Sequence, residues 1–325
     1  MSDLFEGPEK KLEIILRRPD TTLRDNSDGR WTRVVQASGA AIISRLPGER
    51  VDAYLLSESS LFVWDDRVLM ITCGDTTLID AVPPILSLVG LANVATVFYQ
   101  RRRLMFPALQ PQAVDFEAEA ARLNRWFKGR SYRLGPANRD HVHVFVAAPA
   151  SLRPAGDMTV ELLMAGLSPA CAALFDACRA QSQTTRAVLE RIEGLAGEFK
   201  TDAHFFTPQG YSLNATRSGT YCTVHVTPQS KVSYASFESN LIQDSYEDTM
   251  AELIDVFRPD RFSLVITRSS DLKRSSDLDR LCRPPRGYQV TETSHCEFDI
   301  GYEILFANLI RISNPAPDFI ERAGP

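Results

Sequence analysis

Strand-like and helix-like segments alternate along this chain of 325 residues, and this alternation restricts its fold more than any other feature. From Lys11 to Leu16, apolar and charged side chains alternate, which predicts a strand with two different faces. One face carries Leu12, Ile14 and Leu16, and the other carries Glu9, Lys11 and Glu13. Further strands are predicted at residues 67–72 and 95–99, and helices at 77–91, 116–127 and 159–180, the last interrupted at Pro169.

The second half of the chain repeats this scheme. Strands are predicted at residues 203–206, 220–226, 232–238 and 262–267, with a helix at 246–257 before the last of them. Strands that follow one another as a meander, with helices after them, indicate α+β layers in which antiparallel sheets are covered by helices. No clean linker separates two parts of the chain, so residues 1–325 are expected to form a single domain.

Composition and charge fit a soluble enzyme and exclude several other classes of protein. The net charge of -5 argues against a nucleic-acid partner. No apolar run approaches the roughly 18 residues that a membrane span needs, and charged residues stand where a signal peptide would be apolar. We therefore expect a cytoplasmic protein with no membrane partner. The 6 cysteines and 5 histidines show no metal-ligand spacing, which predicts reduced thiols and no metal site.

The stretch from Tyr54 to Val63 places Glu58, Ser59 and Ser60 inside an otherwise apolar, extended segment. One explanation is a turn or β-bulge between two short strands, because Ser hydrogen-bonds its own backbone. The other is chemical: a Ser hydroxyl in a strained backbone attacks the preceding carbonyl, and the ester that forms is broken by β-elimination. The chain is then cut, and its new N-terminus carries a pyruvoyl group, an electrophile made from the chain itself. This stretch alone leaves both explanations open.

Two further clusters combine aromatic, acidic and hydroxyl side chains. Phe5, Glu6 and Glu9 lie near the N-terminus and form either a solvated chain end or part of a site. In the second cluster, residues 206–212 contain a Gly-Tyr-Ser turn, and His225 lies on a strand one hairpin away. A lone strand His is usually structural, but this turn can bring a hydroxyl within reach of the imidazole.

Taken together, these segments resemble the eukaryotic-type S-adenosylmethionine decarboxylases, the pyruvoyl enzymes that make the aminopropyl donor for spermidine and spermine. Four separated motifs carry the resemblance, in the order that the family has: Phe5-Glu6-Gly7-x-Glu9-Lys10, Tyr54-Leu55-Leu56-Ser57-Glu58-Ser59-Ser60, Thr72-Cys73-Gly74, and Gly210-Tyr211-Ser212-x-Asn214 leading into His225-x-Thr227-Pro228 and Ser233-Tyr234-x-Ser236-Phe237-Glu238. The resemblance spans residues 4–270 and thins toward the C-terminus. It implies a four-layer αββα sandwich, with two antiparallel sheets face to face, helices outside and pseudo-duplicated halves.

The resemblance implies self-cleavage between Glu58 and Ser59, into a small chain of residues 1–58 and a larger chain of residues 59–325. The larger chain would begin with a pyruvoyl cofactor made from Ser59. Ser212 matches the family residue that hydrogen-bonds the peptide under attack, and His225 matches the base that drives ester elimination. An imidazole that titrates near neutrality suits this proton abstraction.

For turnover, the resemblance implies that the amine of S-adenosylmethionine forms a Schiff base with the pyruvoyl ketone and that CO2 is then lost. Cys73 matches the acid that reprotonates the substrate Cα. Phe5 and Phe206 match the aromatic pair that sandwiches the adenine, and Glu6 and Glu9 match acidic residues at the active site. Further positions that match substrate-binding residues are Leu56, Glu58 and Gln229.

The chain departs from the family pattern at the substrate ribose. Gln229 stands where the family usually has a Glu that hydrogen-bonds the ribose hydroxyls. An amide still accepts one hydroxyl but loses the charge-assisted bond, which is roughly twice as strong as a neutral one. The identity of the substrate therefore depends in part on this residue.

A second departure concerns putrescine, which some family members hold as an activator in a buried acidic cluster. The positions that match this cluster are Glu13, Asp157, Thr159, Glu161 and Glu238. The lysine that helps to bridge the cluster is replaced by Ile71. Because buried carboxylates without a cation are costly, either a diamine binds or another basic group, such as Lys11 or Arg101, supplies the charge. We expect weak or absent activation by putrescine.

The resemblance leaves three functional interpretations. The leading one is an S-adenosylmethionine decarboxylase, and members of that family are often homodimers of the cleaved unit. A second is a pyruvoyl-dependent decarboxylase of ornithine or arginine, which only Gln229 supports. A third is a non-catalytic regulatory paralogue, which predicts the loss of reactive residues. The reactive positions are nevertheless all present, at Glu58, Ser59, Cys73, Ser212 and His225.

Overall fold

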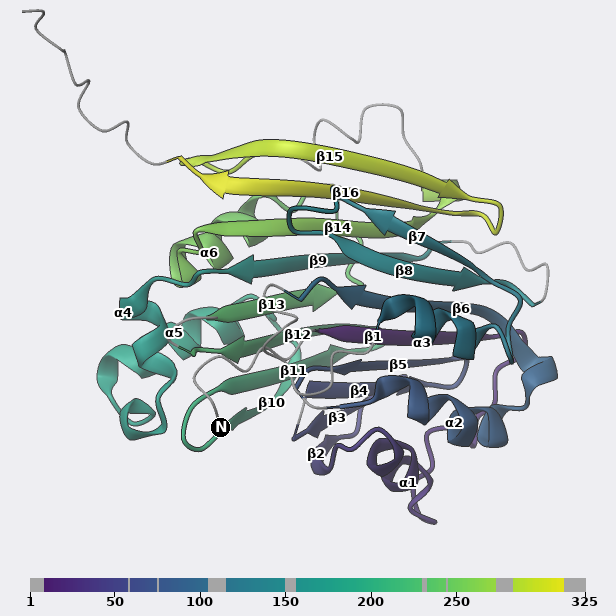
Figure 1. Ribbon diagram of the computed structural model, residues 1–325. Helices are drawn as coiled ribbons and strands as arrows, with labels where there is room; N and C mark the ends of the chain where they lie inside the picture. The colour runs from purple at the N-terminus through teal and green to yellow at the C-terminus, as the bar shows by residue number, and fades with distance from the viewer. Residues whose placement is uncertain are drawn as a thin grey trace, which may run out of the picture.

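The chain forms a sandwich of two eight-stranded antiparallel sheets with helices on the outer faces (Figure 1). The computed structural model describes residues 9–57, 59–74, 76–104, 115–149, 156–229, 233–243, 245–272 and 283–312. The predicted α+β class and the predicted layers are confirmed. Within the described residues, no helix is long and apolar enough to cross a membrane.

The first sheet contains the strands of the N-terminal half, in the order β2-β3-β4-β5-β1-β6-β8-β7. Their bounds are β1 Lys10–Leu16, β2 Ile42–Leu46, β3 Val51–Leu56, β4 Ser59–Trp64, β5 Arg67–Thr72, β6 Val94–Arg102, β7 Arg130–Leu134 and β8 Val142–Ala147. The second sheet has the order β10-β11-β12-β13-β9-β14-β16-β15. Its strands are β9 Met158–Ala165, β10 Lys200–Phe205, β11 Tyr211–Arg217, β12 Thr220–Thr227, β13 Tyr234–Ser239, β14 Arg261–Ser269, β15 Tyr288–Phe298 and β16 Tyr302–Arg311.

The two sheets have the same connectivity, because each strand of the second sheet takes the place of the strand eight numbers earlier in the first. This repetition confirms the predicted pseudo-duplicated halves. The first strand of each half is inserted near the middle of its sheet, with a strand from later in the same half on either side. As a result, β1 and β9 are central strands whose two faces are both covered.

The helices separate the two outer cores from solvent. The α-helices are α1 Arg30–Ala37, α2 Val82–Val89, α3 Phe116–Leu123, α4 Pro169–Ala172, α5 Gln183–Gly194 and α6 Glu247–Phe257. Short 3₁₀ turns lie at Leu78–Ala81, Leu91–Asn93, Ala173–Phe175, Ala177–Arg179 and Ser270–Leu272. In the N-terminal half, Trp31 and Ile85 of the helices pack against Leu12 and Leu61 of the sheet. In the C-terminal half, the apolar stripe of α6 packs against β9 and its neighbours.

The space between the sheets is apolar at its two sides and charged in its middle. On one side, Phe98 packs edge-on against Tyr302 of the facing sheet, with ring centroids 5.0 Å apart. On the other side, Phe62 and Tyr221 meet across the sheets at 4.5 Å. Between these two clusters lie buried charged side chains, among them Lys11 and Glu13 of the polar face predicted for Lys11–Leu16. The polar face of a strand is therefore buried here, not solvated.

The largest error of the sequence analysis is the helix predicted over residues 159–180. Residues up to Ala165 form strand β9, and only the short α4 at Pro169–Ala172 is helical within the first part of that range. A strand covered on both faces is apolar at almost every position, and periodicity cannot distinguish such a run from a buried helix. Two other predicted helices are shorter than expected, since 77–91 divides into short pieces and 116–127 ends at Leu123.

Candidate active site

The break between the two apolar strands is a tight connection from β3 to β4. Leu56 and Ser59 face each other as a strand pair, and the amide of Ala41 donates a hydrogen bond to Ser57 Oγ over 3.0 Å. Ser59 is 3% exposed and has a φ of 130°, a backbone conformation that side chains with a Cβ rarely adopt. The turn explanation and the strained-serine explanation therefore describe the same place. Glu58, the residue on the other side of the predicted cleavage point, lies outside the described residues.

A Ser–His pair lies on the facing sheet, opposite the start of β4. Ser212 on β11 and His225 on β12 are direct strand partners, and Ser212 Oγ lies 2.8 Å from His225 Nδ1. Burial lowers the pKa of His225 to about 3, because the charged imidazolium loses its hydration in the interior. His225 is consequently neutral near pH 7, as a proton acceptor must be.

Two hydroxyls contact the other nitrogen of His225, and the amide of Asn214 contacts both hydroxyls. Thr223 Oγ1 lies 2.9 Å from His225 Nε2, and Ser60 Oγ reaches the same nitrogen from the first sheet over 3.2 Å. Both hydroxyls donate to Asn214 Oδ1, over 2.9 Å from Thr223 and 2.6 Å from Ser60. Ser60, the second residue after the predicted cleavage point, thus links that point to the Ser–His pair. Ser60, Thr223 and Asn214 were not predicted as site residues. Polar residues at alternate positions of otherwise buried strands could have indicated Asn214 and Thr223, because such residues share one face with Ser212 and His225.

Strand register brings Cys73 and Glu9 to the same end of the sandwich. Thr72 pairs with Ser59 on one side and with Lys10 on the other, so Cys73 and Glu9 each extend one residue beyond this row. Tyr234 of the facing sheet donates to Glu9 Oε2 over 3.4 Å. Glu9 is buried, and desolvation raises its pKa to about 7, so the solvated-end interpretation is wrong for this residue. Phe5 and Glu6 lie outside the described residues.

The remaining predicted substrate-binding residues occupy different settings. Phe206 follows β10 and is half-buried, with its amide donating to Gly210 O over 2.9 Å. Gln229 is half-buried as well, and its Oε1 is a buried acceptor without a hydrogen bond among the described residues. Leu56 is fully buried in the core between the first sheet and its helices. The side chain of Leu56 therefore belongs to the core on the helix side of the first sheet.

The acidic cluster between the sheets contains a lysine of this chain. Lys11 on β1 forms a short ion pair with Glu161 of β9 and lies 3.3 Å from Glu238 Oε2 of β13. Gln100 donates to the other oxygen of Glu161 over 2.6 Å, and Tyr221 donates to Glu238. Burial lowers the pKa of Lys11, but the charges of Glu161, Glu238 and Glu13 outweigh that effect, and the net shift is upward. Lys11 is the strand partner of Ile71, the position where the resemblance predicts a lysine. The ammonium of Lys11 therefore comes from the neighbouring strand, directly beside that position.

An arginine completes the cluster on its other side. Arg67 at the start of β5 pairs with Glu13 over 2.9 Å and with Asp157 through two contacts of 2.9 Å. Tyr302 adds a hydrogen bond to Asp157 over 2.6 Å, and Thr159 is buried on the neighbouring part of β9. Of the two basic groups proposed from the sequence, Lys11 is confirmed as a member of the cluster. Arg101 is not, because it pairs with Glu119 of α3 on the helix side of the sheet.

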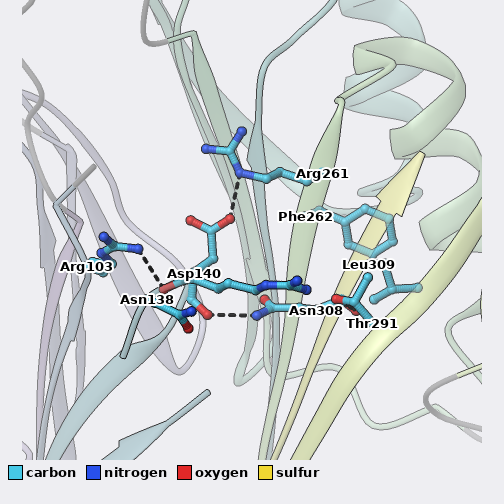
Figure 2. A pocket seen from close by; sticks show the side chains of 9 residues that line it. Arg103, Asn138, Asp140, Arg261, Phe262, Thr291, Asn308 and Leu309 are labelled. Atoms are coloured by element: carbon cyan, nitrogen blue, oxygen red, sulfur yellow. Dashed lines mark hydrogen bonds and ion pairs between the residues drawn. The ribbon is translucent and has the colours of Figure 1, made fainter. Parts of the chain in front are cut away.

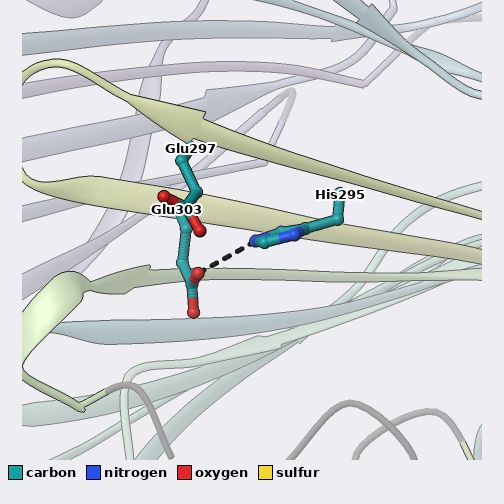
Figure 3. A group of neighbouring side chains, drawn as sticks. All are labelled: His295, Glu297 and Glu303. Carbon is teal, nitrogen blue, oxygen red and sulfur yellow. Dashed lines mark hydrogen bonds and ion pairs between the residues drawn. The ribbon is translucent and has the colours of Figure 1, made fainter. Parts of the chain in front are cut away.

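Two other polar groups in the structure are separate from these residues. A cavity of about 310 Å³ is lined by Arg103, Asp140 and Arg261 among others, and no predicted site residue lines it (Figure 2). The one carboxylate among the described residues that line it, Asp140, is already paired, with Arg261 Nε 2.6 Å from Asp140 Oδ2. His295, Glu297 and Glu303 bring their ligand atoms within 4.8 Å of one another on the β15–β16 hairpin (Figure 3). A cation there would have to share Glu303 with Arg268, which already pairs with it at 2.6 Å.

Comparisons with known proteins agree with this architecture. Residues 2–309 match the family model of adenosylmethionine decarboxylase. The S-adenosylmethionine decarboxylase proenzyme of Leishmania donovani is 34% identical, over 81% of this chain and 72% of that protein. The proenzyme of Xenopus laevis is 30% identical, over 95% of this chain and 96% of that protein.

The solved structure of Trypanosoma brucei AdoMetDC-delta26 monomer is similar, with a TM-score of 0.62 and 24% identity over 78% of this chain and 99% of that one. This likeness shows the fold class, an α+β sandwich of two facing sheets. The chain belongs to the adenosylmethionine decarboxylase family.

Proposed function

We propose that this chain is the proenzyme of an S-adenosylmethionine decarboxylase, and that it makes its own pyruvoyl cofactor by cutting itself between Glu58 and Ser59. The observation that carries the proposal is the strained, buried Ser59, whose neighbour Ser60 contacts the imidazole of the Ser212–His225 pair. The family and the names of the relatives support the same activity.

Self-processing begins when Ser59 Oγ attacks the carbonyl carbon of Glu58. The C–N bond between these residues breaks, an ester takes its place, and the amine of residue 59 is released. A base then removes the Cα proton of residue 59, the Cβ–Oγ bond breaks, and Glu58 leaves as the carboxylate that ends the small chain. Water converts the resulting dehydroalanine into ammonia and the pyruvoyl group. His225 is the base that we assign to the elimination, because it is neutral and lies between Ser212 at its Nδ1 and Ser60 at its Nε2.

A pyruvoyl group at position 59 fits this site, since the position is 3% exposed and polar side chains of the facing sheet reach the adjacent residue. Such a group supplies the electron sink that decarboxylation requires. Cys73, next to the strand partner of Ser59, is the residue that we assign as proton donor to the substrate Cα. A thiol is a weak acid that can fill this role.

The residues around the site suit S-adenosylmethionine. Phe206, together with Phe5, offers aromatic faces for the adenine and for the sulfonium charge. Glu9 and Glu6 supply carboxylates for a cationic substrate. Gln229 presents a buried Oε1 that has no hydrogen bond among the described residues, which is the acceptor that a ribose hydroxyl needs. Leu56 and Glu58 complete the predicted substrate-binding set, Leu56 through its backbone.

We further propose that putrescine is a weak activator or none. Lys11 and Arg67 each pair with two of the four carboxylates of the cluster. Burial raises the pKa of Glu238 to about 8, so protons neutralise part of the remaining acidic charge. A diamine would have to displace the ammonium of Lys11 from two carboxylates. The cation that the family has at the position of Ile71 is in this chain supplied by Lys11 on the adjacent strand.

The cleaved unit is proposed to work in the cytoplasm as a homodimer. Among the described cysteines, Cys171, Cys178, Cys222 and Cys296 are free thiols, as expected in a reducing compartment. The dimer is a prediction from the family resemblance, and light scattering of the purified, cleaved protein tests it.

Mass spectrometry of the purified chain tests the cleavage. We expect two fragments, one of residues 1–58 and one starting with a pyruvoyl group at position 59, while Ser59→Ala stays intact. CO2 release from labelled S-adenosylmethionine, measured beside ornithine and arginine, then tests the substrate. An uncut chain that retains Ser59 contradicts the proposal, and release from ornithine or arginine alone contradicts the substrate assignment.

A further inference from the structure

Two hydroxyls, those of Ser60 and Thr223, contact Nε2 of His225, and both donate their protons to other acceptors. Ser60 donates to Asn214 Oδ1 over 2.6 Å. Thr223 donates either to Asn214 Oδ1 over 2.9 Å or to Leu213 O over 3.0 Å. A hydroxyl has one proton and two lone pairs, so each of these oxygens turns lone pairs toward the imidazole.

This arrangement decides which nitrogen of neutral His225 carries the proton. Nε2 faces oxygen lone pairs of Thr223 at 2.9 Å and Ser60 at 3.2 Å, and it must donate to make a hydrogen bond with them. Nδ1 is then the nitrogen with a lone pair, and it accepts the proton of Ser212 over 2.8 Å. The basic nitrogen of His225 is therefore the one covered by Ser212.

Asn214 controls this pattern through the orientation of its amide. If its Nδ2 faced the two hydroxyls, Ser60 would lose its acceptor and turn its proton toward Nε2, which would favour a lone pair on Nε2 of His225 instead of on Nδ1. Instead, Oδ1 faces the hydroxyls. Nδ2 has no hydrogen bond among the described residues and no contact with water, because Asn214 is 0% exposed. In this orientation, Oδ1 is the common acceptor of the Ser60 and Thr223 hydroxyls.

The strand register makes this coupling direct. Asn214 and Thr223 are partners on β11 and β12, and Ser212 and His225 are the next pair on the same face. Ser60 reaches the group from the facing sheet, one residue from the predicted cleavage point. All five side chains are buried, so bulk water does not compete for their hydrogen bonds.

We propose that Asn214 is a positioning residue that fixes His225 in the Nε2–H tautomer, through the hydroxyls of Ser60 and Thr223, so that Nδ1 is the nitrogen that accepts a proton. The role in self-processing rests on the proposed function, whereas the tautomer is a property of the uncut chain. Asn214 acts only through the hydroxyls of Ser60 and Thr223, and we assign it no contact with the scissile peptide or the substrate.

The test is ¹⁵N NMR of histidine-labelled Ser59→Ala protein, which is uncut, with His225→Gln to assign the signal. We expect the Nε2–H tautomer in this background, and a shift toward the Nδ1–H tautomer in Asn214→Leu and Thr223→Val. Thr223→Ser keeps the hydroxyl and should restore the original tautomer. Thr216→Val is the matched control, since Thr216 is buried on β11 and its hydroxyl has no partner among the described residues.

In chains that retain Ser59, the rate at which the 1–58 fragment appears should fall at least about tenfold for Asn214→Leu and Thr223→Val, because a positioned base supplies about 10²–10⁴-fold. Thr223→Ser and Thr216→Val should stay near the parent rate. The Nδ1–H tautomer in Ser59→Ala, or an unchanged tautomer in both Asn214→Leu and Thr223→Val, overturns the proposal. Absence of cleavage in the parent chain with the expected tautomer overturns the proposed function instead.

Discussion

The ammonium of Lys11, on the first strand of one sheet, lies 3.3 Å from a carboxylate oxygen of Glu238 on the facing sheet. This contact crosses the centre of the sandwich, where both side chains are excluded from water. A buried pair contributes little net stability by itself, but removal of one partner leaves an uncompensated charge. The relation between Lys11 and Glu238 therefore determines how the interior responds to an added cation.

Replacement of Lys11 by Met should destabilise the protein and make it responsive to putrescine. Loss of one partner of a buried ion pair costs about 3–5 kcal/mol, and a diamine that supplies the missing charge should recover part of it. Thermal unfolding with increasing putrescine measures both effects. The exposed Lys200→Met is the control, and it should unfold like the parent protein at every putrescine concentration. A dose-dependent rise in the melting temperature of the parent protein would contradict the proposed role of Lys11.

Ser212→Ala and His225→Gln should both slow self-cleavage, and His225→Gln should slow it more. Ser212 holds the imidazole at 2.8 Å, whereas His225 is assigned as the base itself, a function worth about 10²–10⁴-fold. Time courses of fragment formation after synthesis of the full chain give the rates. Equal rates in His225→Gln and the parent chain would show that another group removes the proton.

The buried His225 should make the protein less stable in acid. Its pKa is about 3 in the folded chain and about 6.5 when unfolded, so the unfolded state binds an extra proton between these values. Stability should therefore fall as pH decreases from 6.5 toward 3, by at most about 1.4 kcal/mol per pH unit from this group. Urea unfolding of Ser59→Ala with and without His225→Gln isolates the contribution. His204→Gln, at a half-buried histidine, should leave the slope unchanged.

Glu9 should have the opposite pH dependence. Burial raises its pKa to about 7 from an unfolded value of 4.5, so the folded state holds a proton that the unfolded state has lost. Stability from this group is present below pH 4.5 and is lost as pH rises through 7, by up to about 3 kcal/mol. Glu9→Gln in the Ser59→Ala background should be more stabilising at pH 8 than at pH 4.5 in urea titrations. The exposed Glu190→Gln should show no such difference.

Gln229→Glu should lower the Michaelis constant for S-adenosylmethionine. A carboxylate accepts a charge-assisted hydrogen bond, which is roughly twice as strong as the bond that the buried amide oxygen of Gln229 can accept. Initial rates over a range of substrate concentrations measure the change, with kcat expected to stay near the parent value. An unchanged Michaelis constant, or loss of the native activity, would show that position 229 does not bind the ribose.

The sequence was sufficient for the motifs and for most strands, because these features are local. Alternation along β1 and the apolar β5 and β14 were predicted within two residues of their observed ends. The Glu-Ser-Ser break was found because polar residues interrupt an apolar run. Strand β9 was missed for the opposite reason, since burial on both faces removes the alternation that marks a strand.

The partners of the polar residues required the tertiary structure. Lys11 and Arg101 were equivalent candidates in the sequence, yet the register of β1 with β6 places Lys11 beside Gln100 and Arg101 one position further along. A shift of one residue reverses the face of a strand, and β6 is apolar over most of its length, so its pattern does not fix that face. Packing between the sheets therefore decided that Lys11 points to the acidic cluster and Arg101 to Glu119.

By itself, the sequence determined the chemistry that is available: a serine in a break between strands, a histidine and a serine on a hairpin, and carboxylates at alternate positions. Only the tertiary structure decided that Ser60 meets His225 across the two sheets and that Asn214 and Thr223 surround the same imidazole. The physical reason is that a strand pattern defines which side chains share a face. Which faces meet depends on how two complete sheets pack, and no local pattern encodes that.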